Sequence, residues 1–131
     1  MSFEQHGIIL IDVIFNVLQM IVNKTKRIII SEKEKCCKSI FSKAKGLMFS
    51  RRMWRPLVFF FDREQKVSIH MFFVFFPIDV VYLDESRKVV CVKENVKPFR
   101  VVEPVNCRYI VELAENSVKK YKIEKEDMIG F

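Results

Sequence analysis

Two ionisable side chains stand inside the most apolar run of the chain. His70 and Asp79 are the only histidine and the only carboxylate between Val67 and Leu83. Buried ionisable groups are where pKa values shift and where functional sites are found. In the structural alternative, each side chain caps a strand or hydrogen-bonds to backbone groups. No nucleophile motif and no second carboxylate of matching spacing accompanies them, so the sequence favours the structural alternative.

Strand geometry limits what this pair can do. Neighbouring side chains of a regular strand point to opposite faces, so only one of His70 and Met71 can enter the core. Asp79 comes two residues after Pro77. A bend at the proline would leave backbone N–H groups without partners, and the Asp79 carboxylate can accept hydrogen bonds from them.

Arginines around the single tryptophan form the best candidate contact patch. Arg51, Arg52 and Arg55 flank Trp54. Guanidinium groups offer forked donors to phosphate or carboxylate, and an indole can stack on a base or on arginine. In the structural alternative, which the sequence favours, Trp54 fills the mouth of a barrel and the arginines cover its rim.

The basic charge of the chain is concentrated in one segment. The formal net charge is +7, but Lys24 to Arg55 holds eleven basic and two acidic residues, a local +9. Such a cluster can attract nucleic acid phosphates, anionic lipid or an acidic protein, and it is also ordinary on a solvated face. The candidate ligand-binding or anion-binding residues are Lys45, Arg51, Arg52, Trp54, His70 and Asp79.

The cysteines do not predict a metal site. Cys36, Cys37, Cys91 and Cys107 lack the C-x-x-C spacing that structural zinc sites favour. We therefore expect neither a metal nor a cofactor. No persuasive secretion signal precedes the domain, so the thiols are interpreted as reduced side chains of a cytoplasmic protein, with a Cys91–Cys107 disulfide left open.

The N-terminal segment is predicted to be helical. Between residues 7 and 23, Asp12, Asn16, Gln19 and Asn23 recur at steps of four, three and four and draw one narrow polar stripe. A helix of this length spans roughly 25 Å, short of the roughly 30 Å hydrocarbon core of a bilayer. Three interpretations remain open: a helix docked on the domain, a membrane-surface or partner-binding helix, and an extension upstream of a translation start at Met20. We favour the last.

The rest of the chain predicts a β-rich domain. Short apolar or alternating runs indicate strands at residues 27–30, 57–61, 80–83, 89–92, 99–102, 107–113 and 128–131. The run 67–83 is expected to form two strands joined by a bend at Pro77, and residues 84–87 to form a hairpin turn. Short helices are expected near 39–48 and 117–121. The pattern therefore predicts a mainly β, compact, antiparallel, barrel-like single domain over residues 20–131, preceded by the helical extension 1–19.

Four separated motifs resemble, in order, the domain of unknown function 192 family, most closely its archaeal branch. They are Lys43-x-Lys45-Gly46-Leu47-Met48-Phe49-x-Arg51, the run from His70 to Asp84, Lys97-Pro98, and Arg108-Tyr109-Ile110-Val111-Glu112-Leu113. The resemblance implies a compact β-rich barrel-like domain without an established activity. Many bacterial members read Trp-Met-Lys-Asn-Thr where this chain has His70-Met71-Phe72-Phe73-Val74, so a polar site built there is not implied for it.

Two functional hypotheses follow. The first is a non-enzymatic binding module that presents the Lys24 to Arg55 face to an anionic partner, either protein or nucleic acid. The second is a small-ligand pocket or hydrolytic site at a barrel mouth that uses His70, Asp79 and Arg51. A third hypothesis attaches residues 7–23 to a membrane surface, with the following basic residues facing acidic lipid.

Overall fold

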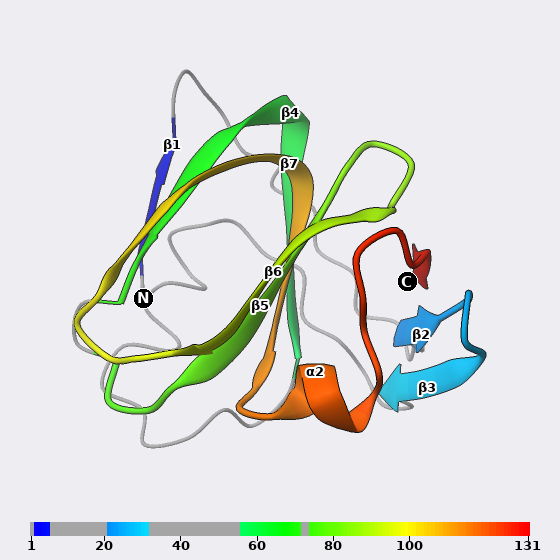
Figure 1. The fold of residues 1–131 in the computed structure, drawn as a ribbon. Helices are drawn as coiled ribbons and strands as arrows, with labels where there is room; N and C mark the ends of the chain where they lie inside the picture. Colours follow the sequence, from blue (N-terminus) through cyan, green and yellow to red (C-terminus); the bar gives the residue numbers. More distant parts are fainter. Residues whose placement is uncertain (1, 6–20, 32–55, 72–73) are drawn as a thin grey trace.

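Two antiparallel sheets and one short helix make up the described part of the computed structural model, which covers residues 2–5, 21–31, 56–71 and 74–131. The large sheet has the order β1-β4-β7-β5-β6 and the small sheet the order β3-β2-β8. The elements are β1 (Ser2–Gln5), β2 (Ile21–Asn23), β3 (Ile28–Ser31), β4 (Leu57–His70), β5 (Ile78–Leu83), β6 (Val89–Val96), β7 (Val101–Ala114), α2 (Ser117–Lys120) and β8 (Ile129–Gly130) (Figure 1).

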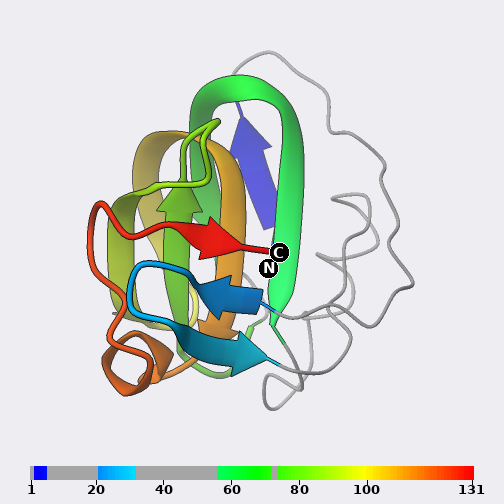
Figure 2. The same ribbon diagram turned by 90° about the vertical axis from the view of Figure 1, so that its right-hand side faces the viewer.

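The large sheet bends because its two longest strands share a break in register. β4 and β7 are each 14 residues long. Phe60 pairs with Tyr109, yet the next pair along is Gln65 with Cys107, so β4 carries extra residues at this corner. Irregularities of this kind bend a strand. Residues 62–64 are exposed at the corner, and β4 runs as an arch over the rest of the sheet (Figure 2).

The bend folds β4 back over its own first half and so builds the first hydrophobic core. Phe59, from before the corner, belongs to the same buried cluster as Ile69 and Met71 from after it. Tyr82 of β5 and Ile110 of β7 extend this cluster across the sheet. Phe59, Phe61 and Phe76 are buried in this cluster, and their aromatic side chains remove large apolar areas from water.

The opposite face of the large sheet is covered by the small one. Ile21 of β2 and Ile129 of β8 pack with Val81 of β5 and Leu113 of β7 in a second buried cluster. Because successive residues of β5 alternate between the two cores, all six of its residues are buried. The buried run 78–83 is thus a central strand with both faces covered.

The β5–β6 hairpin is closed by a side chain of its own turn. The Asp84 carboxylate accepts hydrogen bonds from the backbone N–H groups of Ser86 at 2.8 Å and Lys88 at 3.0 Å. Arg87 takes the left-handed conformation with φ 66°. An aspartate that binds backbone amides a few residues ahead is typical of such turns, and the hairpin predicted at residues 84–87 is confirmed.

The prediction of a mainly β, compact, antiparallel domain is confirmed, and in the described residues the large sheet does not close into a barrel. β1 and β6 are the outer strands of the large sheet and pair with β4 and β5, not with each other. The strand predicted at 57–61 continues through the polar corner to His70. The run 67–83 does contain two strands, but β4 and β5 flank β7 and do not pair directly.

Part of the N-terminal prediction can be compared with the structure. The last three residues of the helix expected over 7–23 form strand β2, and Ser2–Gln5 form strand β1. Residues 7–20 and the helix expected near 39–48 lie outside the described residues. The helical turn expected near 117–121 is present as α2. In the ranges that the structure describes, no helix is long and apolar enough to cross a membrane.

Candidate functional site

Most of the predicted contact patch lies outside the described residues. Lys45, Arg51, Arg52 and Trp54 fall in the range 32–55, outside the described residues. The same holds for the greater part of the basic segment Lys24 to Arg55. Of the six candidate residues, His70 and Asp79 can therefore be placed.

Asp79 is fully buried in β5, and both of its oxygens accept hydrogen bonds from backbone amides. Oδ1 accepts from the N–H of Asn95 at 2.9 Å, and Oδ2 accepts from the N–H of Val118 at 2.9 Å. Asn95 has φ 51°, where β6 departs from regular strand geometry, and Val118 lies in the first turn of α2. The carboxylate thus joins three elements and satisfies two amides that strand pairing does not. This geometry favours the structural interpretation of Asp79.

His70 and Met71 divide between surface and core as strand geometry requires. Met71 is fully buried, whereas His70, the last residue of β4, is half-buried. His70 pairs with Val101 and Asp79 pairs with Leu113, which lie at opposite ends of β7. The register therefore does not place His70 and Asp79 as neighbours across the sheet.

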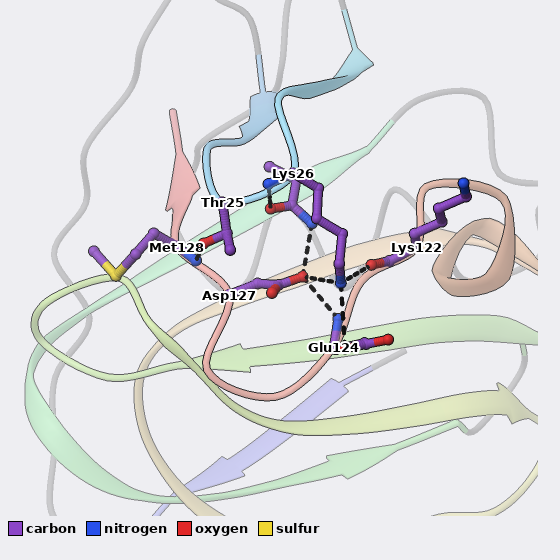
Figure 3. Close-up of polar contacts among 7 residues, drawn as sticks. Thr25, Lys26, Lys122, Glu124, Asp127 and Met128 are labelled. Carbon is purple, nitrogen blue, oxygen red and sulfur yellow. Dashed lines mark hydrogen bonds and ion pairs between the residues drawn. The ribbon is translucent and has the colours of Figure 1, made fainter.

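A second buried carboxylate fixes the small sheet to the C-terminal segment (Figure 3). Oδ2 of Asp127 accepts hydrogen bonds from Asn23 Nδ2 at 2.8 Å, Lys26 Nζ at 2.8 Å and Glu124 N at 3.0 Å. Nζ of Lys26 also donates to the carbonyl of Lys122. Burial alone would raise the pKa of Asp127, but the donors from Lys26 and Asn23 outweigh it and hold that pKa below its usual value.

Further hydrogen bonds next to Asp127 join the β2–β3 turn to the segment that leads into β8. The N–H of Met128 donates to Thr25 Oγ1 at 2.8 Å, and the N–H of Lys24 donates to the carbonyl of Met128 at 2.7 Å. Asn23 is fully buried and Asp127 nearly so. With three donors already on one oxygen of Asp127, this cluster is best explained as the link between the β2–β3 turn and the approach to β8.

Polar groups inside the first core do not assemble a metal site. Tyr82 is fully buried, and its hydroxyl has no hydrogen-bond partner among the described residues. Burial raises the pKa of Tyr82 above its usual range, and burial raises the pKa of the Cys107 thiol to about 12. Cys91 and Cys107 are free thiols, not a disulfide. Within the placed ranges, no three histidine, cysteine or acidic side chains come together as metal ligands would.

The most distinctive exposed surface is one that sequence reasoning missed. We call it the aromatic–basic loop, and it consists of Phe75, Lys97, Phe99, Arg100 and Val101. All five residues are exposed, with 51% exposure for Phe75, 53% for Phe99 and 57% for Val101. The two phenylalanine rings meet edge to face, with centroids 5.5 Å apart and planes at 68°.

Buried Met71 holds this loop by its backbone. The N–H of Phe99 donates to the carbonyl of Met71 at 2.7 Å, and the N–H of Met71 donates to the carbonyl of Arg100 at 2.7 Å. Phe99 itself has φ 60°, a conformation that bulky residues rarely adopt. In the sequence, the phrase Lys97-Pro98-Phe99-Arg100 places one aromatic residue between two basic ones, whereas Phe75 lies in an apolar run that is interpreted as core.

Comparison with known proteins places the fold and the family. The model of the DUF192 family, described as Uncharacterized ACR, matches residues 20–131. A UPF0127 protein of Thermococcus kodakarensis is 34% identical over 115 residues, which are 86% of this chain and 73% of that protein. A UPF0127 protein of Pyrococcus horikoshii is 35% identical over 113 residues, covering 84% of this chain and 96% of that protein.

Two solved structures share the fold at low sequence identity. A Sinorhizobium meliloti protein, described as a candidate transcription regulator, has a TM-score of 0.67 at 19% identity, covering 85% of this chain and 89% of that one. A Novosphingobium aromaticivorans protein of unknown function has a TM-score of 0.68 at 18% identity, covering 86% and 82%. The archaeal relatives match over most of this chain, and the family model covers all but its first residues. The chain belongs to the DUF192 family, whose description assigns no activity.

Proposed function

We propose that this protein is a non-enzymatic, cytoplasmic binding module for an anionic partner. The observation that carries the proposal is the aromatic–basic loop, where two half-exposed phenylalanine rings contact each other and the exposed cations Lys97 and Arg100 lie on either side of Phe99 along the chain. Single exposed apolar residues are common on soluble proteins. Adjacent exposed rings with cations beside them are less common, and they combine apolar contact with charge attraction.

The distribution of charge supports the same function. The chain has a formal net charge of +7, and Lys24 and Arg27 are exposed in the turn between β2 and β3. This turn and the β6–β7 connection that carries Phe99 lie on opposite sides of the molecule (Figure 1). Basic residues away from a contact surface still raise the local concentration of an anion and its association rate. We therefore assign long-range attraction to the basic segment and contact to the loop.

The carboxylates give no support to the hydrolytic alternative. That alternative uses His70, Asp79 and Arg51 together, but both oxygens of Asp79 already accept backbone hydrogen bonds inside the protein. A general base must have an oxygen within reach of the proton that it removes.

The free thiols of Cys91 and Cys107 agree with a reducing compartment.

Retention of the full chain on immobilised heparin, eluted with a salt gradient, tests the proposal. We expect retention at low salt and elution of the Lys97→Glu/Arg100→Glu variant at clearly lower salt, because two contacts to the polyanion are lost. Lys119→Glu/Lys125→Glu is the matched control, since both lysines are exposed and the change in charge is the same. Absence of retention at low salt would overturn the proposal, and so would equal shifts for the two variants.

A further inference from the structure

We infer that the aromatic–basic loop is a stacking site for single-stranded nucleic acid. The inference rests on the proposed function and names its partner. Single-stranded nucleic acid presents unpaired bases with exposed ring faces and a phosphate beside every base. Proteins bind it with aromatic side chains on which bases stack and with basic residues along the backbone. Both kinds of side chain occur in the five-residue segment Lys97 to Val101, which leads into β7.

The rings are held in place before any ligand arrives. Phe99 contacts Phe75 edge to face at 5.5 Å, and its N–H donates to the Met71 carbonyl, while the Met71 N–H donates to the carbonyl of the neighbouring Arg100. Because the Met71 side chain is fully buried, the loop is tied to the first core. A contact surface that is already ordered loses less entropy on binding than a mobile one.

Exposure leaves ring surface available to a base. Phe75 keeps 51% and Phe99 keeps 53% of its surface in contact with solvent, although the two rings touch each other. An edge-to-face pair at 68° leaves ring faces turned in different directions. One base stacked on such a ring strengthens binding by about fivefold to a hundredfold. Val101, which is 57% exposed, extends the apolar surface next to the rings.

The cations lie on both sides of the ring along the chain. Lys97 is two residues before Phe99 and Arg100 directly follows it, and both are exposed. A base on Phe99 would therefore have basic side chains near the phosphates on each side. Duplex bases are covered by their neighbours in the stack, so this arrangement selects single strands. The apolar part, three side chains, is small for a stable protein interface, which typically buries about 800 Å² on each partner.

The backbone of Phe99 gives a second, independent argument. A phenylalanine at φ 60° stands where glycine or asparagine would fit with less strain. Strained residues of this kind gather at ligand-binding positions, where the side chain is needed for more than folding. If the ring serves binding, replacement of Phe99 by glycine removes the ligand contact while it relieves the backbone.

The test measures binding of the full chain to four probes. Fluorescence anisotropy follows a short labelled oligothymidylate and a duplex of the same length, with heparin as competitor. Co-sedimentation follows vesicles of phosphatidylcholine with phosphatidylserine. We expect preference for the single strand. For Phe99→Gly we expect the dissociation constant for oligothymidylate to rise about tenfold or more. Its denaturation midpoint should be equal to or above that of the wild type. Phe99→Trp keeps an aromatic plane and should keep binding.

The outcomes separate the inference from the proposed function. Unchanged oligothymidylate affinity in Phe99→Gly overturns the inference, as does equal affinity for duplex and single strand. Binding to heparin or to anionic vesicles without binding to oligothymidylate overturns the inference and leaves the proposed function standing. If the full chain binds neither oligothymidylate nor heparin, the inference and the proposed function are both overturned. If Phe99→Gly proves less stable than the wild type, Phe99→Trp decides, because failure of this variant to bind overturns the inference.

Discussion

Replacing Asp79 tests whether its carboxylate is structural or functional. In Asp79→Ala, the N–H groups of Asn95 and Val118 lose the acceptors that each holds at 2.9 Å. Leaving a buried donor unsatisfied costs about 1–3 kcal/mol, and bonds to a charged acceptor lie at the upper end of the range. Two such donors give an expected loss of about 3–5 kcal/mol. That is a large share of the about 5–15 kcal/mol by which domains are stable.

Asp79→Asn refines the same prediction. The asparagine amide has nearly the shape of the carboxylate, but only its oxygen can accept, so its NH₂ group faces one of the two backbone donors. Because one hydrogen bond can survive, we expect Asn to cost less than Ala, about 2–3 kcal/mol. The exposed residue Asp62 supplies the matched control, and Asp62→Asn should change stability by less than about 0.5 kcal/mol.

The assay is equilibrium unfolding in guanidinium chloride, followed by tryptophan fluorescence and circular dichroism, with the midpoint and slope fitted together. The order of stability should be wild type, then Asp79→Asn, then Asp79→Ala. Removal of a catalytic or ligand-binding carboxylate commonly leaves stability unchanged or raises it, because functional sites trade stability for function. Asp79 variants as stable as the wild type would therefore refute the structural reasoning and revive the site that combines His70, Asp79 and Arg51.

Three further predictions concern other parts of the fold. Because the pKa of Asp127 is lowered in the folded state, its contribution to stability is present above its ordinary pKa and is lost as pH falls through the folded value. The stability difference between wild type and Asp127→Asn should therefore narrow below about pH 4 in urea unfolding. In a Cys36→Ser/Cys37→Ser/Cys91→Ser background, Cys107 should react with a disulfide reagent at neutral pH only after unfolding, since its pKa is about 12 and it is fully buried. A Cβ on Gly130 would lie 2.5 Å from Cε of Lys24, so Gly130→Ala should cost about 1 kcal/mol or less, and a double-mutant cycle should show the cost vanish with Lys24→Ala.

Local patterns predicted the strands that have a regular register. The alternation through Cys107 to Leu113 correctly placed Tyr109, Val111 and Leu113 on one face, since these residues share the second core. Strand geometry allowed only one of His70 and Met71 into the core, and the structure shows that it is Met71, which is fully buried, while His70 is half-buried. Period-two reasoning succeeds in these segments because each residue's face is fixed by the strand itself.

Long-range pairing explains what sequence reasoning missed. Strand β4 was divided at Asp62 because a polar run resembles a loop, but there it forms the exposed corner of a bend whose two arms both pair with β7. The small sheet joins Val22 to Gly130 from opposite ends of the domain. No local pattern encodes that pairing, which forms the small sheet separate from the large one in the described residues.

The candidate site was missed for a related reason. Phe75 and Phe99 become neighbours only because β4 ends at His70 and the following Met71 binds the backbone of residues 99 and 100. In the sequence, Phe75 is one of several phenylalanines in an apolar run, and most of the described apolar residues there are buried. Composition cannot distinguish the exposed ring of Phe75 from the buried ring of Phe76. The strained conformation of Phe99, by contrast, is visible only in the folded chain. It distinguishes Phe99, whose side chain strains the backbone, from the buried phenylalanines, which stabilise the core. That distinction is why a glycine at position 99 should leave the domain at least as stable as the wild type and weaken ligand binding in the same protein.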